Sequence, residues 1–111
     1  GLGIPAEPLF DLLKPLLFAI PNGAFLQGEK MQRIRQWKKL EAEGAKRGVP
    51  DLFLAVPRGD YAGLFLEMKT EKGIVSKEQR YMMLMLDKQG YRCEVCYGVD
   101  EFIKKVNIYL A

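Results

Sequence analysis

The chain has 111 residues, of which 49% are hydrophobic and 28% are charged, a composition typical of one globular domain spanning residues 1–111. It contains no histidine, which excludes Ser-His-Asp and Cys-His catalysis and histidine-based zinc hydrolysis. The net charge of +3 is mild, and no apolar run reaches the ~18–20 residues that span a bilayer. We therefore expect a soluble, intracellular protein without membrane contact, whose chemistry depends on carboxylates, lysine and a hard cation.

The N-terminal third predicts short elements followed by a basic helix. A brief helix is expected after Pro8, and residues 16–20 are typical of a strand that ends at the turn Pro21-Asn22-Gly23. From Glu29 to about Arg47 the composition is helical and rich in lysine and arginine. One apolar stripe runs along this helix at three-residue steps: Met31, Ile34, Trp37 and Leu40. The basic side chains are either a solvated face over a packed stripe or a surface that contacts the phosphates of a polyanion.

Two apolar runs of strand length, residues 51–56 and 64–69, form the centre of the sequence. Asp51 opens the first run, and Glu67 and Lys69 close the second. Because side chains alternate along a strand, Glu67 and Lys69 share a face, and a hairpin of this register brings Asp51 beside Glu67. Two carboxylates and an ammonium at the edge of an apolar sheet are either an ion pair or a metal-binding group.

The next helix is predicted to begin at Ser76, which forms the S-x-x-Q signature of a capping box with Gln79. Residues 81–86 are apolar on nearly every side of this helix, so it is either fully buried or shared with a partner. Methionines suit adaptable interfaces, and we expect a homodimer contact here. Gly90 ends the helix, residues 91–97 form another strand, and a last helix completes the chain.

The two cysteines, Cys93 and Cys96, form a C-x-x-C motif on this last strand. A zinc site would need two further cysteine or histidine ligands, and a redox pair would stand at the start of a helix. A strand places the two thiols on opposite faces instead. We therefore expect ordinary core and surface cysteines.

Five short phrases follow one another in a characteristic order: Ala19-Ile20-Pro21-Asn22-Gly23, Gly48-Val49-Pro50-Asp51-Leu52, Gly63-Leu64-Phe65-Leu66-Glu67-Met68-Lys69, Ser76-Lys77-Glu78-Gln79 and Gly90-Tyr91. In this order and spacing the chain resembles the VRR-NUC (virus-type replication-repair nuclease) family of the PD-(D/E)XK nuclease superfamily, particularly its small stand-alone phage members. The resemblance runs from about Leu16 to the C-terminus. It implies an α/β fold with a restriction-endonuclease-like core, a mixed sheet flanked by helices, and a phage or prophage origin. The predicted order of elements agrees with this fold.

The resemblance also implies a metal-dependent endonuclease and a role for each site residue. Asp51, Glu67 and the Met68 carbonyl would bind Mg²⁺ or Mn²⁺. Lys69 would orient the attacking water and stabilise charge on the phosphate, and Gln79 would position the water or the lysine.

The substrate implied by the resemblance is branched DNA, such as a four-way (Holliday) junction cut by a homodimer with two sites on a two-fold axis. No recognition helix or aromatic-interleaved basic motif is present, which favours structure-directed cutting. The residues expected to line a groove for phosphates are Asn22, Lys30, Arg33, Lys46, Arg47, Arg58 and Lys72. Two alternatives stay open: a nuclease of the same chemistry that nicks or trims flaps and ends, and a non-catalytic nucleic-acid-binding module. Relatives carry a further metal-site glutamate on their first helix, a place for which Glu7 is the only candidate before the first strand.

Overall fold

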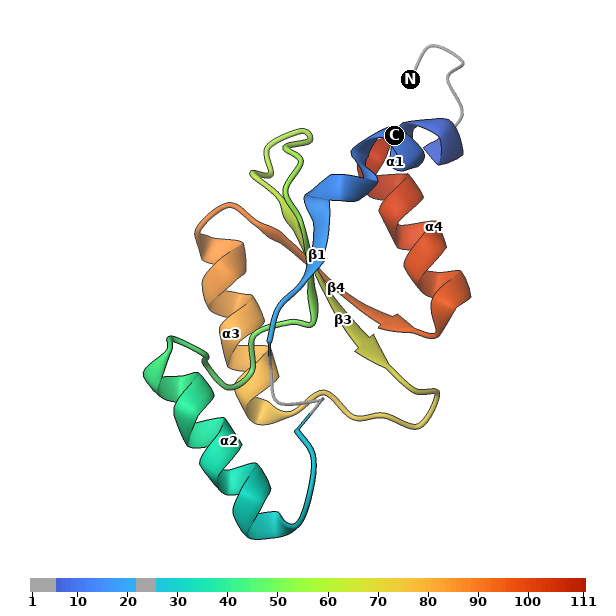
Figure 1. Cartoon of the computed structure of the whole chain (residues 1–111). Coiled ribbons are helices and arrows are strands. Elements are labelled where there is room, and N and C mark those ends of the chain that lie inside the picture. The colour runs from blue at the N-terminus through green and yellow to red at the C-terminus, as the bar shows by residue number, and fades with distance from the viewer. Residues whose placement is uncertain (1–5, 22–25) are drawn as a thin grey trace.

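The computed structural model describes residues 6–21 and 26–111, in which helices and strands alternate (Figure 1). None of the described helices is both long and apolar enough to cross a membrane. The elements are α1 (Ala6–Leu13), the 3-10 helix η1 (Lys14–Leu16), β1 (Leu17–Ala19), α2 (Lys30–Ala42), β2 (Leu52–Leu54), β3 (Leu64–Lys69), α3 (Lys77–Lys88), β4 (Arg92–Tyr97) and α4 (Val99–Leu110).

The strands form one mixed sheet in the order β1-β2-β3-β4. β1 pairs with β2, and β2 with β3, in antiparallel fashion, whereas β4 returns through α3 and pairs with β3 in parallel. In the central hairpin Leu52 lies opposite Leu66 and Leu54 opposite Leu64. The predicted α/β fold, with its antiparallel hairpin and helical crossover to the last strand, is confirmed.

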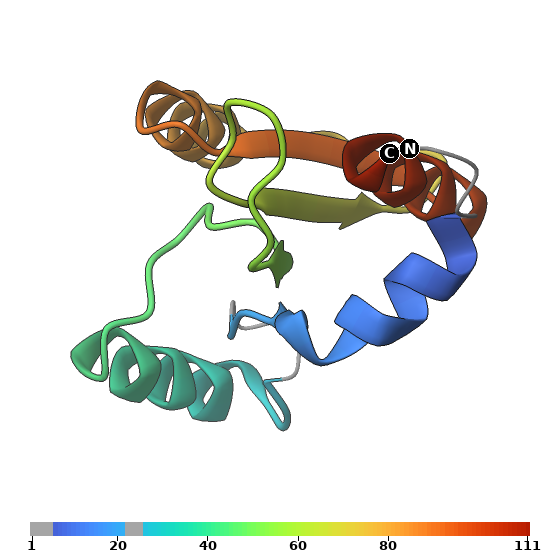
Figure 2. The ribbon, with the colours of Figure 1, turned by 90° about the horizontal axis from the view of Figure 1, so that it is seen from above.

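One face of the sheet carries the hydrophobic core. Alternate residues of the strands place Leu54, Leu64, Leu66 and Cys96 on this face, where none of them has measurable exposure. Val106 of α4 completes the buried cluster, and side chains of α1 pack against it. Figures 1 and 2 show α1 and α4 on this side of the sheet, with α3 and α2 on the other. Full burial of such a side chain stabilises the fold by ~1.5–3 kcal/mol.

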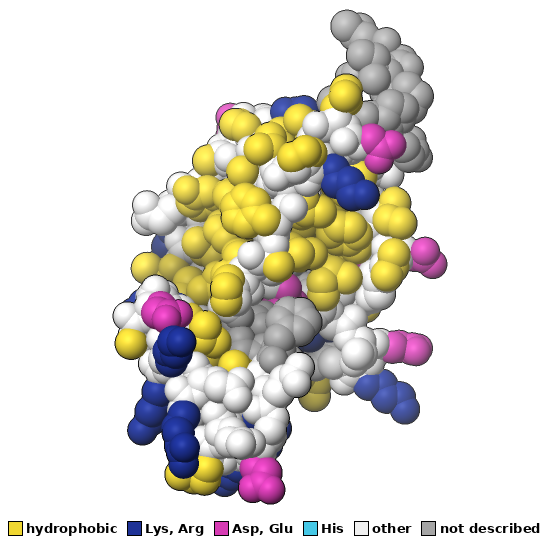
Figure 3. All heavy atoms as spheres, in the orientation of Figure 1, with side chains coloured by type: hydrophobic (Ala, Val, Ile, Leu, Met, Phe, Trp, Pro, Cys, Tyr) yellow, Lys and Arg dark blue, Asp and Glu magenta, His cyan; other side chains and the backbone are white. Residues whose placement is uncertain are grey.

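The opposite face carries a row of aromatic rings. Phe53 stands in the middle, with ring centroids 5.7 Å from Phe18, 4.4 Å from Phe65 and 5.9 Å from Tyr91. Phe18, on the edge strand, is 49% exposed. Figure 3 shows apolar side chains gathered over the middle of the molecule, and basic side chains around α2. Because Phe65 and Glu67 are two residues apart on β3, this face leads directly to the predicted catalytic residues.

Helix α2 differs from its prediction in length and in packing. It ends at Ala42 rather than near Arg47, because Gly44 adopts a φ of +107° that a helix cannot continue through. Of the expected apolar stripe, Met31 is 60% and Ile34 37% exposed, and Trp37 is buried. The three-residue spacing was correct, but the expected packed stripe is wrong for the first half of the helix.

Helix α3 is not buried, which removes one of the two alternatives predicted for its apolar sequence. No residue of α3, all of which the structure describes, is fully buried. Tyr81 is 64%, Leu84 52% and Met85 39% exposed, and their spacing places them on one side of the helix. This side of α3 has an apolar surface facing solvent.

The cysteines are free thiols on opposite faces of β4, as predicted. Cys96 belongs to the hydrophobic core, whereas Cys93 is half-buried and directs its thiol at the Met83 carbonyl of α3 (3.7 Å). Burial, with smaller contributions from Asp87 and Glu94, raises the pKa of Cys93 to about 11. Neither thiol has the low pKa of a redox-active cysteine.

Candidate active site

The central hairpin brings Asp51 and Glu67 together. The register of β2 and β3 places them opposite each other, one step beyond the Leu52–Leu66 pair. The Met68 backbone N–H donates to Asp51 Oδ2 over 2.8 Å, and the Asp51 carbonyl accepts from Ile20 N–H over 2.8 Å. Asp51 is thus held between β1 and β3, with its carboxylate at the C-terminal end of β3.

Glu67 is an acidic side chain buried on the aromatic face of the sheet, opposite the hydrophobic core. It is 3% exposed, and Lys69 Nζ lies 3.5 Å from its Oε1 atom. The other oxygen, Oε2, is buried and has no hydrogen-bond partner among the described residues. Burial raises the pKa of Glu67 above its ordinary value and the charge of Asp51 raises it further, while Lys69 opposes both effects.

Gln79 completes the capping box of α3 and also contacts the acidic pair, while its predicted role toward the attacking water or Lys69 stays a prediction. Its Oε1 accepts the Ser76 N–H over 2.8 Å, and the Ser76 hydroxyl accepts the Gln79 N–H over 3.1 Å, which completes the capping box of α3. Its Nε2 at the same time donates to Glu67 Oε1. The helix cap therefore fixes the amide that orients a carboxylate of the site.

Gly48 sets the path of the chain into Asp51. Its φ of +85° favours glycine, and a Cβ there would lie 2.5 Å from the Glu78 carbonyl oxygen in the first turn of α3. Pro50 follows, fully buried. The Gly-Val-Pro-Asp phrase thus joins the N-terminus of α3 to the start of β2, and this contact brings Gln79 within reach of Glu67.

The residues present fit a hard divalent cation. Mg²⁺ prefers oxygen ligands and is commonly bound by one or two carboxylates together with waters and substrate phosphate. Asp51 and Glu67 supply such a pair, and the unpartnered Glu67 Oε2 is a buried acceptor that a cation would satisfy. Among the described residues no three acidic or cysteine side chains converge, so further ligands must be carbonyls, waters or substrate. The Met68 side chain packs on the core face, and a carbonyl role for this residue stays a prediction.

Comparison with known proteins identifies the family. The model of the VRR-NUC domain matches residues 18–100, which include every residue of the acidic site. The chain belongs to the VRR-NUC family. A solved structure described as a VRR_NUC domain protein is similar to this chain with a TM-score of 0.70 and 28% identity, covering 88% of this chain and 69% of that one. No curated protein gives a significant match. Family membership makes this a domain of a nuclease family.

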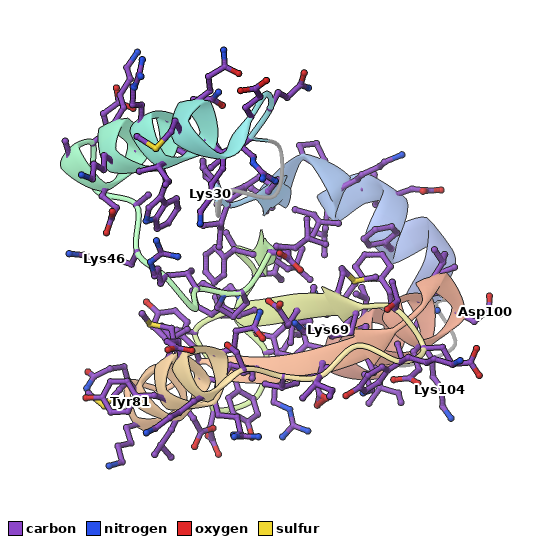
Figure 4. All side chains as sticks on the ribbon, turned by 90° about the horizontal axis from the view of Figure 1, so that it is seen from below. Lys30, Lys46, Lys69, Tyr81, Asp100 and Lys104 are labelled. Carbon is purple, nitrogen blue, oxygen red and sulfur yellow. The ribbon has the colours of Figure 1, made fainter. Side chains whose placement is uncertain are left out.

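The predicted phosphate-contacting residues of this VRR-NUC domain separate into groups. Lys30, Arg33 and Arg47 line one pocket beside α2, whereas Lys46 lines a different hollow on the other side of the loop. Figure 4 shows Lys30 on the side of α2 that faces the sheet and Lys46 pointing outward. Lys72 is exposed in the loop that follows β3.

Arg58 does not belong with these residues. It lies at the far end of the hairpin from Asp51, where it donates to the backbone carbonyls of Pro57 and Leu110. Six residues of a nearly extended chain lie between Asp51 and Arg58, so the hairpin holds Arg58 away from the pocket that Lys30, Arg33 and Arg47 line, and its contact with DNA stays a prediction. Asn22 lies outside the described residues, and so does the side chain of Glu7.

One contact near the site has no clear signal in the sequence. The Arg47 guanidinium stacks over the Trp37 ring, 4.7 Å from its centroid. Trp37 was assigned to the apolar stripe and Arg47 to the phosphate-contacting residues, and their separation of ten residues indicates no pairing. The contact arises because the chain reverses at Gly44 and returns past α2.

Proposed function

We propose that this VRR-NUC domain is a Mg²⁺- or Mn²⁺-dependent endodeoxyribonuclease that hydrolyses phosphodiester bonds in branched DNA, four-way (Holliday) junctions foremost. One observation carries the proposal: a buried oxygen of Glu67 that has no hydrogen-bond partner in residues 6–21 and 26–111, opposite a second carboxylate and beside a lysine. Burying an unpaired carboxylate oxygen lowers the stability of a small domain unless a cation binds that oxygen. Membership of a nuclease family supplies the chemistry that this arrangement would serve.

Each side chain has a distinct task in the proposed reaction. A bound divalent cation would polarise the phosphate and lower the pKa of its bound water. Asp51 and Glu67 would hold that cation, and the Met68 carbonyl would add a third oxygen. Gln79 holds Glu67 Oε1 through its amide, which leaves Oε2 for the cation. The Lys69 ammonium, 18% exposed and therefore reachable, would orient the attacking water and stabilise the charge that develops on the phosphate.

The charges around the site support a DNA substrate. Lys30, Arg33 and Arg47 lie around a concave surface next to Gln79, and Lys72 follows the catalytic strand. Lysine and arginine that neutralise phosphates contribute sequence-independent affinity.

We also propose that the nuclease acts as a homodimer through α3. Tyr81, Leu84 and Met85 form an exposed apolar side of this helix, a surface that a second copy would cover. Two copies related by a two-fold axis would present two sites to opposed strands of a junction. Sedimentation of the parent chain and of Leu84→Glu tests this, because the parent should be dimeric and the variant monomeric at micromolar concentration. A monomeric parent overturns the dimer.

A panel of labelled DNA structures tests the proposed activity. Four-way junction, flap, blunt duplex and single strand are incubated with the chain, with Mg²⁺, Mn²⁺ or chelator. We expect cation-dependent cleavage, fastest on the junction, and its loss by about 100-fold or more in Asp51→Asn, Glu67→Gln and Lys69→Ala. Asp60→Asn, an exposed aspartate in the hairpin turn, is the matched control and should cut like the parent.

Each other outcome supports a different conclusion. Faster cleavage of flaps or ends than of junctions would replace the proposed substrate but keep the chemistry. Junction binding that persists in Lys69→Ala, with no cation-dependent cleavage by the parent, would identify a non-catalytic binding module. Cleavage retained by both carboxylate variants would overturn the proposed site.

A further inference from the structure

A concave pocket lies between α2 and the loop that returns from it, outside the acidic site. Its volume is about 430 Å³. The lining combines four cations with apolar side chains, against one carboxylate, Glu41. Lys30, Arg33, Trp37 and Arg47 are among the lining residues. A cavity of this size and mixed chemistry suits a small ligand with one flat apolar part and one anionic part.

The floor of this α2 pocket is the stacked pair of Trp37 and Arg47. Trp37 is 7% exposed and is the only tryptophan in the chain. Its indole N–H is buried and has no acceptor among the described residues, which is an unfavourable state for a donor. Arg47 is exposed above it, so the outer face of its guanidinium is open to a second planar group. A ligand with a flat ring could stack on Arg47, and its anionic part could pair with Lys30 and Arg33.

The α2 pocket borders the N-terminus of α3. A second hollow of about 280 Å³ shares Trp37 and Arg47 with it and extends to Ser76 and Gln79. Gln79 in turn donates to Glu67. The side chain of Gln79 therefore links this second hollow to the acidic pair.

We propose that the α2 pocket binds one unpaired nucleotide of the DNA substrate, with its base stacked on Arg47 and its phosphate held by Lys30 and Arg33. The inference rests on the proposed function, for which it names the recognised feature of a branch. An intact duplex keeps its bases inside the stack and presents a convex backbone, so it does not fill a concave pocket. An unpaired nucleotide exposes a flat base for the guanidinium plane of Arg47 and phosphate oxygens for Lys30 and Arg33.

Trp37 fluorescence provides a direct test that needs no cleavage. The parent chain, in chelator, is titrated with a short oligothymidylate and separately with a short blunt-ended duplex of equal phosphate content. We expect a saturable change in tryptophan emission with oligothymidylate and little change with duplex, because only the unpaired strand reaches the Trp37–Arg47 floor.

Two arginine-to-lysine variants isolate the stacking. Arg47→Lys keeps the positive charge but removes the planar group, and we expect its affinity for oligothymidylate to fall at least about fivefold. Arg35→Lys, a change at an exposed arginine of the same helix outside the pocket, should bind as the parent does. Equal emission changes with duplex, or unaltered affinity in Arg47→Lys, would overturn the inference.

The two proposals fail in distinguishable ways. If the tryptophan emission changes with oligothymidylate but not with duplex, and the chain cuts no DNA, the nuclease proposal is refuted. The pocket would then still be a nucleotide-binding site. A chain that cuts branched DNA without the selective change would refute only the pocket.

Discussion

Replacing Gln79 by glutamate would keep one of its two hydrogen bonds and abolish the other. A carboxylate at position 79 still accepts the Ser76 N–H, because glutamate serves this position of a capping box as well as glutamine. It offers no hydrogen to Glu67 Oε1, and it adds a third negative charge beside Asp51 and Glu67. Gln79→Glu therefore distinguishes the effect of capping α3 from the effect of the hydrogen bond to Glu67.

The two contacts have different expected energies. The capping interaction is worth ~1 kcal/mol, and Ser76→Ala measures it alone. A hydrogen bond to a charged group is worth ~1.5–3 kcal/mol, a value that applies with little solvent screening because Glu67 is 3% exposed. Without a divalent cation we expect the free energy of unfolding to fall by ~1 kcal/mol in Ser76→Ala, and by ~2–4 kcal/mol in Gln79→Ala. Gln79→Glu should lose ~2–3 kcal/mol, since it keeps the cap but adds repulsion.

Urea unfolding with chelator and with saturating Mg²⁺, followed by single-turnover cleavage, measures these effects. Mg²⁺ should recover part of the stability of Gln79→Glu, because a cation neutralises the added charge. Cleavage should stay close to the parent rate in Ser76→Ala and fall about 10- to 100-fold in Gln79→Ala. If Ser76→Ala slows cleavage as much as Gln79→Ala, or if Gln79→Glu cuts at the parent rate, then Gln79 is only a helix cap.

Three further outcomes are expected. Because the pKa of Glu67 is raised, the folded state binds its proton more tightly than the unfolded chain, and this residue's contribution to stability is lost as pH rises from about 4.5 through the folded pKa. Without a cation, Glu67→Gln should therefore unfold at a higher urea concentration than the parent at pH 7, by a margin that shrinks toward pH 4.5. Parallel pH profiles of the two proteins would contradict this prediction. Gly48→Ala should lower the free energy of unfolding by about 2 kcal/mol or more, because the alanine would have a left-handed φ and its Cβ would clash with the Glu78 carbonyl. Gly44→Ala has open space around its Cβ and should lose only the ~1–2 kcal/mol that a left-handed φ costs an alanine. Equal losses of the two variants in urea unfolding would refute the clash. Cys93 should react with iodoacetamide at pH 8 about 100-fold more slowly in the folded than in the unfolded chain, because its pKa is about 11 rather than 9.0. Time courses of the intact mass measure both rates, and equal rates would refute this prediction.

The hairpin was predictable because alternation and turn chemistry together fix its register. Once Leu52 is set opposite Leu66, Asp51 must face Glu67, and no long-range information is needed. The capping box was equally local, since Ser76 and Gln79 are three residues apart. These are the parts of the site that short-range rules of chain geometry determine.

The surroundings of the hairpin depended on contacts that a linear pattern does not encode. Periodicity identified an apolar stripe on α2 but could not show that only Trp37 finds a buried place. Arg58 is near Asp51 in sequence, yet the length of the hairpin carries it to the opposite end of the domain. The stacking of Arg47 on Trp37 likewise depends on where the chain reverses at Gly44, which fixes the path of the return loop.

The loose attachment of α2 has an evolutionary consequence. Among its thirteen residues, all of which the structure describes, Trp37 alone is buried, so most positions on this helix can change without disturbing the sheet. Glu67 and Lys69 lie instead on β3, and Asp51 directly precedes β2, two strands whose register the core fixes. Under the proposed function, substitutions on α2 could change which DNA structures the domain binds, while the proposed catalytic residues stay unchanged.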